Sequence, residues 1–190
     1  SSVAKSIRSG NNADEATEKL LWVGPSAPVD LDPRYEQYLH CEASKMESIG
    51  ARYMLVDAPG ATDDHQTIAV VAARALSLAS VLLVVVRRDQ IRSQTVSMLA
   101  EASEGTVVIP VVNAVRKHDE TLDADIDTLT AHLRKAAPAS AIVAPVIIDD
   151  FEVDGRSEDA VGEAAAKMVA GRLTDEIGNS WEGDRRRSTR

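Results

Sequence analysis

Four short, continuously apolar runs constrain the fold of this chain more than any other feature. They lie at 52–57, 80–86, 106–113 and 141–148, and valine and isoleucine are their commonest residues. Runs of this length are typical of strands buried on both faces, as in a parallel sheet. Because each is far too short to span a bilayer, we expect no membrane-spanning segment.

Helical patterns separate and follow these runs. Apolar residues recur in them at a spacing of three to four, and the last pattern opens with a Ser-Glu-Asp cap at Ser157. The predicted helices cover 62–79, 93–103, 120–137 and 157–177. Alternation of strand and helix predicts an α/β fold of three layers, with a mostly parallel sheet and helices on both faces.

The first fifty residues give no single pattern. Residues 18–24 are compatible with a strand or with a turn of helix, and 24–33 holds three prolines and should be mostly irregular. The pattern of residues 33–50 fits either a helix with Pro33 at its first position or a strand antiparallel to 51–57. The pattern alone does not decide between these alternatives.

Length, charge and cysteine content narrow the class of protein. A chain of 190 residues suits one domain over 1–178, with an irregular region at 1–50, a core at 51–178 and a disordered tail at 179–190. The net charge of −9 argues against a direct nucleic-acid partner. With Cys41 as the single cysteine, neither a disulfide nor a thiolate metal site can form, and a reducing, cytoplasmic setting is expected.

The residues after each apolar run carry the functional argument, because ligands of open α/β sheets bind beyond the carboxyl ends of the strands. These residues are Asp57–Gly60, Arg87–Asp89, Asn113–Arg116 and Asp149-Asp150. An acid that closes a buried strand can hold Mg²⁺ through its water shell. Gly60 would let a backbone N–H approach a phosphate. The stretch Asp-Ala-Pro-Gly is also compatible with a plain turn.

The order of elements between residues 51 and 137 resembles the G domain of GTPases, and is most similar to the translational, elongation-factor type. The shared pattern is a strand ending in Asp-x-Pro-Gly, a helix, an apolar strand, a helix start at Gln94-Thr95, and an apolar strand ending in Asn113. The resemblance implies a P-loop NTPase fold. It also implies binding of GTP (or ATP) with Mg²⁺ and slow hydrolysis as a molecular switch.

The resemblance assigns a role to particular residues. Asp57 would order Mg²⁺ through water, and Gly60 would meet the γ-phosphate and move on hydrolysis. Residues 62–66 would form the switch II segment, which a protein partner would read, and the irregular region at 1–50 would be switch-I-like. Asn113 would lie at the base-recognition position.

Three departures from the family pattern limit this reading. The base motif Asn-Lys-x-Asp is replaced by Asn-Ala-Val-Arg at 113–116, and Asp119 lies three residues too late to serve. Ala61 stands where translational GTPases carry a histidine, which leaves only His65 and Gln66 as catalytic candidates. No G-x-x-x-x-G-K-[ST] motif occurs anywhere in the chain.

The beginning of the chain offers one explanation for the missing motif. The sequence starts Ser-Ser-Val-Ala-Lys, without methionine, and resembles the residues that follow Gly-Lys in a P-loop. We therefore expect a fragment of a larger protein in which Ser1 would supply the magnesium-ligating hydroxyl. An ordinary N-terminal segment is the alternative.

Two other functions fit the same residues. The ending Asn-x-Val-Arg of the third apolar run is similar to that of MinD/ParA-like P-loop ATPases, which also carry strand-Asp-x-Pro. Alternatively, the altered base motif and the missing histidine suit a pseudo-GTPase that acts as a protein-interaction module.

Overall fold

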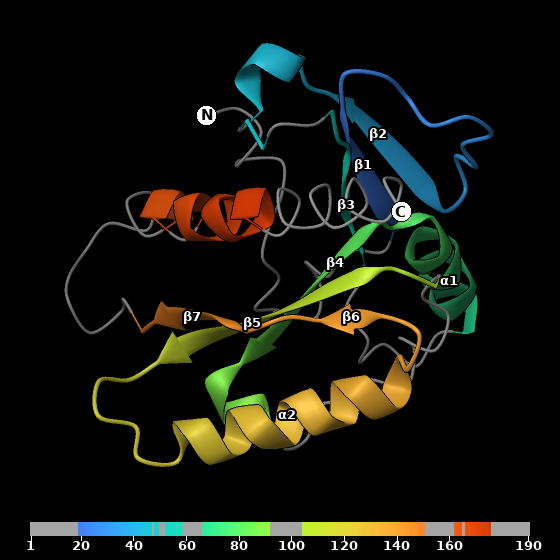
Figure 1. Ribbon diagram of the computed structural model, residues 1–190. Helices are drawn as coiled ribbons and strands as arrows, with labels where there is room; N and C mark the ends of the chain where they lie inside the picture. Colours follow the sequence, from blue (N-terminus) through green and yellow to red (C-terminus); the bar gives the residue numbers. More distant parts are fainter. Residues whose placement is uncertain are drawn as a thin grey trace, which may run out of the picture.

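The described part of the chain forms a mixed α/β arrangement with a small mixed sheet and a four-stranded parallel sheet (Figure 1). The computed structural model describes residues 19–46, 48–49, 52–58, 66–91, 104–150, 162–164 and 166–175. Of residues 66–71 it describes the backbone alone. No helix in these ranges is both long and apolar enough to cross a membrane.

The small sheet has β1 (Leu20–Gly24) at its centre. β2 (Glu36–His40) pairs with β1 in parallel, and β3 (Leu55–Asp57) pairs with it antiparallel. The strand alternative for 18–24 is therefore confirmed. The helix alternative for 33–50 is wrong, because the turn after Asp32 leads directly into β2. The strand antiparallel to β3 is β1 rather than β2, which the pattern did not indicate.

The large sheet is parallel throughout and built around β5 (Val107–Val115). β4 (Val81–Arg87) lies along one side of it. On the other side β6 (Ala141–Ile142) and β7 (Val146–Asp149) pair with successive parts of β5. The predicted strands at 80–86, 106–113 and 141–148 are thus confirmed. The last run is divided in two around Pro145, whose ring nitrogen has no hydrogen to donate to a sheet ladder.

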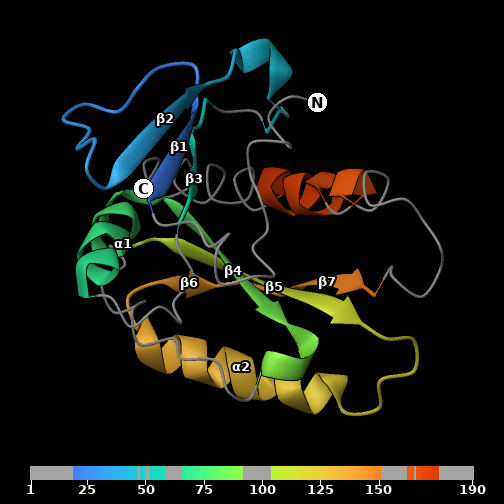
Figure 2. The same cartoon turned by 180° about the vertical axis from the view of Figure 1, so that it is seen from behind.

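Two of the predicted helices frame the large sheet. α2 (Leu122–Ala136) covers one face, and the helical residues 162–164 and 166–175 cover the other (Figures 1 and 2). The core on the α2 side consists of Val86, Ile91, Val112, Val115, Leu129, Leu133 and Ala137. The core on the opposite side is built on Ile109, Val111 and Val146, with Val169 and Leu173 packed against it. The helix predicted at 93–103 lies outside the described residues.

The arrangement of the strands differs from the single mostly parallel sheet expected from the sequence. α1 (Gln66–Leu78) joins the two sheets, since Ala75 packs with Leu20 and Trp22 of the small sheet while Leu76 packs against the α2-side core of the large one. β3 and β4 do not pair with each other within the described residues. Two strands also occupy the region at 1–50 for which an irregular segment was expected.

Candidate functional site

The carboxyl ends of three parallel strands bring together most of the polar residues singled out in the sequence. Arg87 at the end of β4 is in register with Asn113 of β5, and Val115 is in register with Asp149 of β7. The backbone N–H of Asp150 donates to the Val115 carbonyl at 2.7 Å. The expectation that the strand ends share one edge of the sheet is therefore confirmed for these strands.

Asn113 occupies an irregular point of this edge. The pairing of β5 with β7 shifts register between Val112 and Val115, and Ala114 has a φ of +57°. A left-handed backbone is costly for a residue with a Cβ atom, and such strain is concentrated at functional sites. The Asn113 Oδ1 atom is buried and accepts no hydrogen bond within the described structure. A buried amide oxygen without a partner is costly, and an N–H donor brought to it would satisfy it.

Charged residues of both signs follow the strand ends at this edge. Arg87 is exposed and bonds to Asp89 at 3.2 Å. Arg116, three residues after Asn113, is 83% exposed in its side chain and lies 3.9 Å from Asp150. The guanidinium groups of both pairs are exposed, and such pairs are weakly held. The edge can therefore offer guanidinium donors to an anionic ligand beside the amide of Asn113.

Arg88 forms the strongest ionic contacts in this part of the molecule. Its Nε and Nη2 atoms donate to the two carboxylate oxygens of Asp119 at 2.6 and 3.0 Å. Nη1 lies 2.9 Å from Asp125, and Nη2 donates to Thr121 Oγ1 at 2.8 Å. The hydrogen bonds that Arg88 donates hold the pKa of the Asp119 carboxyl below its ordinary value, and the same contacts with Asp119 and Asp125 raise the pKa of Arg88.

These contacts set Arg88 apart from Arg87. The Arg87 side chain is 56% exposed, whereas the Arg88 side chain is 15% exposed. Asp125, in the first turn of α2, is likewise buried at 4% exposure. The reason is that the buried side chains of Ile91 and Leu129 fill the space between β4 and α2. Polar groups beside this apolar core must pair with one another, because burying an unpaired polar group is costly. Asp119 is accordingly bound to Arg88 and not free to read a base.

Asp57 lies apart from this edge. It ends β3 in register with Leu21 of β1, so it belongs to the small sheet while Asn113 belongs to the large one. Desolvation raises the pKa of its carboxyl. A nearby cation would have the opposite effect. One carboxylate with bound water is compatible with Mg²⁺, which takes one or two protein carboxylates, but does not by itself define a site.

The other predicted site residues lie outside the described residues. These are Ser1, Gly60, Ala61 and His65, together with the side chain of Gln66, whose backbone begins α1. The magnesium role of Ser1, the phosphate role of Gly60 and the catalytic roles of His65 and Gln66 therefore stay predictions. Within the described ranges, no three histidine, cysteine or acidic side chains gather as metal ligands would.

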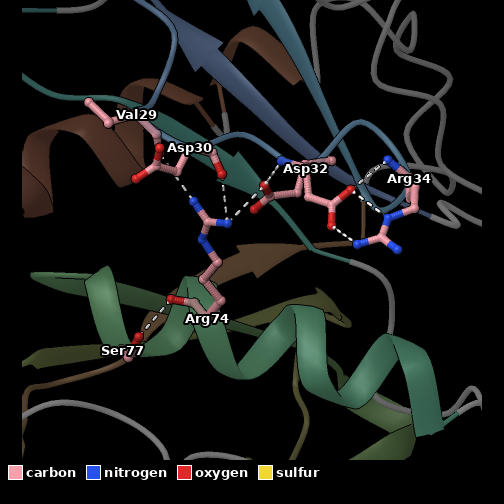
Figure 3. A network of polar contacts seen from close by, with 7 residues as sticks. Val29, Asp30, Asp32, Arg34, Arg74 and Ser77 are labelled. Carbon is pink, nitrogen blue, oxygen red and sulfur yellow. Dashed lines mark hydrogen bonds and ion pairs between the residues drawn. The ribbon is translucent and has the colours of Figure 1, made fainter.

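A second polar cluster, which the sequence did not indicate, ties the loop before β2 to α1 (Figure 3). Arg74 of α1 donates to the carbonyl oxygens of Asp30 and Val29 at 3.1 and 3.3 Å, and lies 3.2 Å from the carboxylate of Glu36. Glu36 is 3% exposed and also accepts from the backbone N–H of Asp32 at 2.7 Å.

This cluster links two segments to which the resemblance gives switch roles. The loop lies in the region at 1–50 that the resemblance would make switch-I-like, and α1 follows the predicted switch II segment. Asp32 is further fixed by Arg34, whose side-chain hydrogen bond lowers the pKa of the Asp32 carboxyl to about 2. A spacing of 38 residues separates Glu36 from Arg74, so no local sequence pattern could have indicated their contact.

Comparison with known proteins gave no match of any of three kinds. No protein-family model, no curated protein and no solved structure is similar to the chain at a significant level.

Proposed function

We propose that this chain is the switch domain of a nucleoside triphosphatase, with a P-loop NTPase-like fold, and that it receives the base of its nucleotide at the polar edge around Asn113. The observation that carries the proposal is the unpartnered, buried Oδ1 of Asn113 beside the left-handed Ala114, at the carboxyl end of the central parallel strand. Purine bases carry N–H donors that such an oxygen can accept.

The contact between Arg74 and the loop before β2 supports a switch role. Arg74 contacts the carbonyl oxygens of Val29 and Asp30 and the buried carboxylate of Glu36. A displacement of the start of α1 would therefore be transmitted to the loop before β2. Switches of this kind couple a phosphate-sensing segment to a surface that a partner reads. Mg²⁺ would be held with Asp57 as one carboxylate and would neutralise phosphate charge.

The type of base is the second part of the proposal. Guanine presents two donors that the family binds with an acid three residues after the asparagine, and here that position is Arg116. Asp119 cannot substitute while it is bound to Arg88 at 2.6 Å. These two observations favour the ATP-binding alternative over GTP at this edge, although the order of elements resembles GTPases.

Direct binding measurements test the proposal. Fluorescent ATP and GTP analogues would be titrated against the 190-residue chain with Mg²⁺, and against the variants Asn113→Ala and Gln37→Ala. Because the chain has no G-x-x-x-x-G-K-[ST] motif, we expect weak binding, with a Kd of ~0.1–1 mM. Loss of the Asn113 contact should weaken it about tenfold, whereas Gln37, exposed on the small sheet, serves as the control.

The outcomes separate the alternatives. Tighter binding of the ATP analogue would favour an ATPase of the MinD/ParA-like kind, and tighter binding of the GTP analogue would favour the GTPase kind. Equal binding to both Asn113→Ala and the unaltered chain would contradict a base site at Asn113. Phosphate release would be measured in the same samples, and binding without turnover would favour a pseudo-GTPase.

A further inference from the structure

The 114–121 segment, which leads from the end of β5 to α2, has a strained backbone at two points. Ala114 and His118 have φ values of +57° and +65°, and only Asp30 joins them among the described non-glycine residues with a positive φ. A left-handed backbone is costly for a residue with a Cβ atom, and it persists only where the surrounding structure fixes it. The segment therefore needs contacts that hold it from outside.

Both ends of the 114–121 segment are held in this way. Near its beginning, the N–H of Asp150 donates to the carbonyl of Val115 at 2.7 Å. At its end, the carboxylate of Asp119 accepts from Nε and Nη2 of Arg88 at 2.6 and 3.0 Å, and Oγ1 of Thr121 accepts from Nη2 at 2.8 Å. Arg88 is thus the side chain that ties the end of the segment to the neighbouring strand.

The position of Arg88 suits this task. It begins η3 (Arg88–Gln90) and directly follows Arg87, which is in register with Asn113 on β5. Its remaining nitrogen, Nη1, lies 2.9 Å from Asp125 in the first turn of α2. Since each of its three guanidinium nitrogens has a carboxylate partner, Arg88 acts through the acids that it holds and not by touching a ligand.

Burial makes the contact between Arg88 and Asp119 a firm tether. Their side chains are 15% and 18% exposed, whereas that of Arg87 is 56% exposed. Charge-assisted, bidentate hydrogen bonds are among the strongest and most directional in proteins, and solvent screens them less where water has little access. The tether should therefore restrict the segment in a way that the exposed pair formed by Arg87 does not.

We propose that Arg88 is a positioning residue of the polar edge: by holding Asp119, it keeps the 114–121 segment in the conformation that directs the amide of Asn113. Asn113 directly precedes the left-handed Ala114, so the path of the segment determines where this amide lies. Without the tether, Ala114 can relax to ordinary backbone angles and the amide moves with it. That the amide receives a nucleotide base rests on the proposed function, whereas the ordering of the segment by Arg88 does not.

Amide hydrogen exchange tests the ordering without nucleotide. The rates would be measured by NMR on the isotope-labelled 190-residue chain. The two reporter amides are the N–H of Asp150 and that of Leu122, which donates to the backbone carbonyl of Asp119 at 3.3 Å. They lie near opposite ends of the segment. The amides of Leu129 and Leu133, whose side chains are buried in the core beside α2, report global unfolding of each variant.

Two substitutions release the tether from opposite sides. Arg88→Ala removes the cation, and Asp119→Ala frees the segment while the pair of Arg88 with Asp125 remains. Both should accelerate exchange of the two reporter amides ~10–100-fold through local opening. Arg88→Lys, which keeps the charge, should recover part of the protection. The control Arg74→Ala removes a guanidinium that pairs with a buried carboxylate elsewhere, and should leave the reporter amides unchanged.

The titration with ATP and GTP analogues, repeated on Arg88→Ala and Arg88→Lys, measures the consequence for the ligand. If the segment is ordered in one molecule in ten, the apparent Kd rises about tenfold. Arg88→Lys should bind more tightly than Arg88→Ala. A Kd that stays unchanged while the reporter amides exchange faster would overturn the link between the segment and Asn113.

The exchange rates decide whether Arg88 orders the segment. Unchanged reporter amides in Arg88→Ala and Asp119→Ala would overturn the proposal, and so would an equal acceleration in Arg74→Ala, because the effect would then be global. If Arg88→Ala does not fold, Asp119→Ala alone decides. If the unaltered chain binds neither nucleotide analogue, the proposed function fails, while the exchange rates still support or overturn the ordering by Arg88.

Discussion

Removal of the Arg88 guanidinium should destabilise the fold far more than removal of its neighbour. Arg88 contacts Asp119 through two nitrogens and reaches Asp125 with the third, and these carboxylates are 18% and 6% exposed in their side chains. The substitution Arg88→Ala leaves both acids without their cation in a place that water reaches poorly. Loss of one partner from a buried ion pair costs more than the pair itself contributes.

The magnitude follows from this burial. Deleting one partner of a buried pair costs ~3–5 kcal/mol, and the partial exposure of Asp119 places the value near the lower end, at ~3 kcal/mol. In a domain of this size each kcal/mol lowers Tm by ~2–4 °C, so the melting temperature should fall by ~6–12 °C. Arg88→Lys keeps the charge but loses the planar fork, and should cost about half as much.

Urea unfolding monitored by circular dichroism would measure the difference, with Arg87→Ala as the matched control. Arg87 and Asp89 are 56% and 66% exposed in their side chains, and such surface pairs contribute ~0–1 kcal/mol. Adding Asp119→Asn to the Arg88→Ala chain should recover part of the loss, because it removes one unpaired charge. If Arg88→Ala and Arg87→Ala proved equally stable, the ionic cluster would have no structural role and the reasoning would fail.

Three further changes probe other strained or buried groups. Ala114→Gly should stabilise the fold by ~0.5 kcal/mol, since relief of ~1–2 kcal/mol of left-handed strain exceeds the entropic cost of glycine. The control substitution Ala124→Gly, in α2, should instead destabilise the fold by ~1 kcal/mol in the same denaturation assay. Arg74→Ala should lower the free energy of unfolding by ~2 kcal/mol, because it leaves the buried Glu36 carboxylate without its cation. A decrease no larger than that caused by replacing an exposed residue would contradict this role of the contact. The pKa of Asp119 is lowered in the fold, so its contribution is complete above the ordinary carboxyl pKa of about 3.9 and is lost as pH falls through the lowered value. The stability gap between the unaltered chain and Asp119→Asn should therefore narrow in melts below pH ~4, and a gap independent of pH would refute the assignment.

The strands of the large sheet could be predicted from the sequence because burial on both faces leaves an unmistakable apolar run. Val81–Arg87 and Val107–Val115 match their predicted ranges to within two residues at each end. The start and end of α2 were predicted equally well from spacing alone. Such features depend on local pattern, which the sequence displays directly.

The small sheet could not be predicted in the same way. β2 contains Glu, Gln and His as well as Tyr and Leu, so its pattern fits several structures, and its partner is fixed only by contacts over a distance in sequence. The pairing of β3 with β1 instead of with the large sheet is likewise decided by tertiary packing, since Leu55–Asp57 is too short to show a preference.

The candidate site shows the same division between local and distant causes. Asn113 and Asp149 could be placed on one edge from the sequence, because parallel strands end together. The engagement of Asp119 by Arg88 could not, as the two residues are 31 positions apart. That contact changes the chemistry of the edge, since it engages the Asp119 carboxylate with Arg88.

The position of Trp22 gives the molecule a built-in optical reporter. Trp22 is 5% exposed, packs with Leu20 and Ala75, and lies in the small sheet, whereas the helical signal of α2 comes from beside the large one. In the variant Trp181→Phe, which leaves Trp22 as the single tryptophan, emission from its indole therefore follows the contact between the small sheet and α1. If emission and helical dichroism change at different urea concentrations, the two sheets unfold as separate cooperative units.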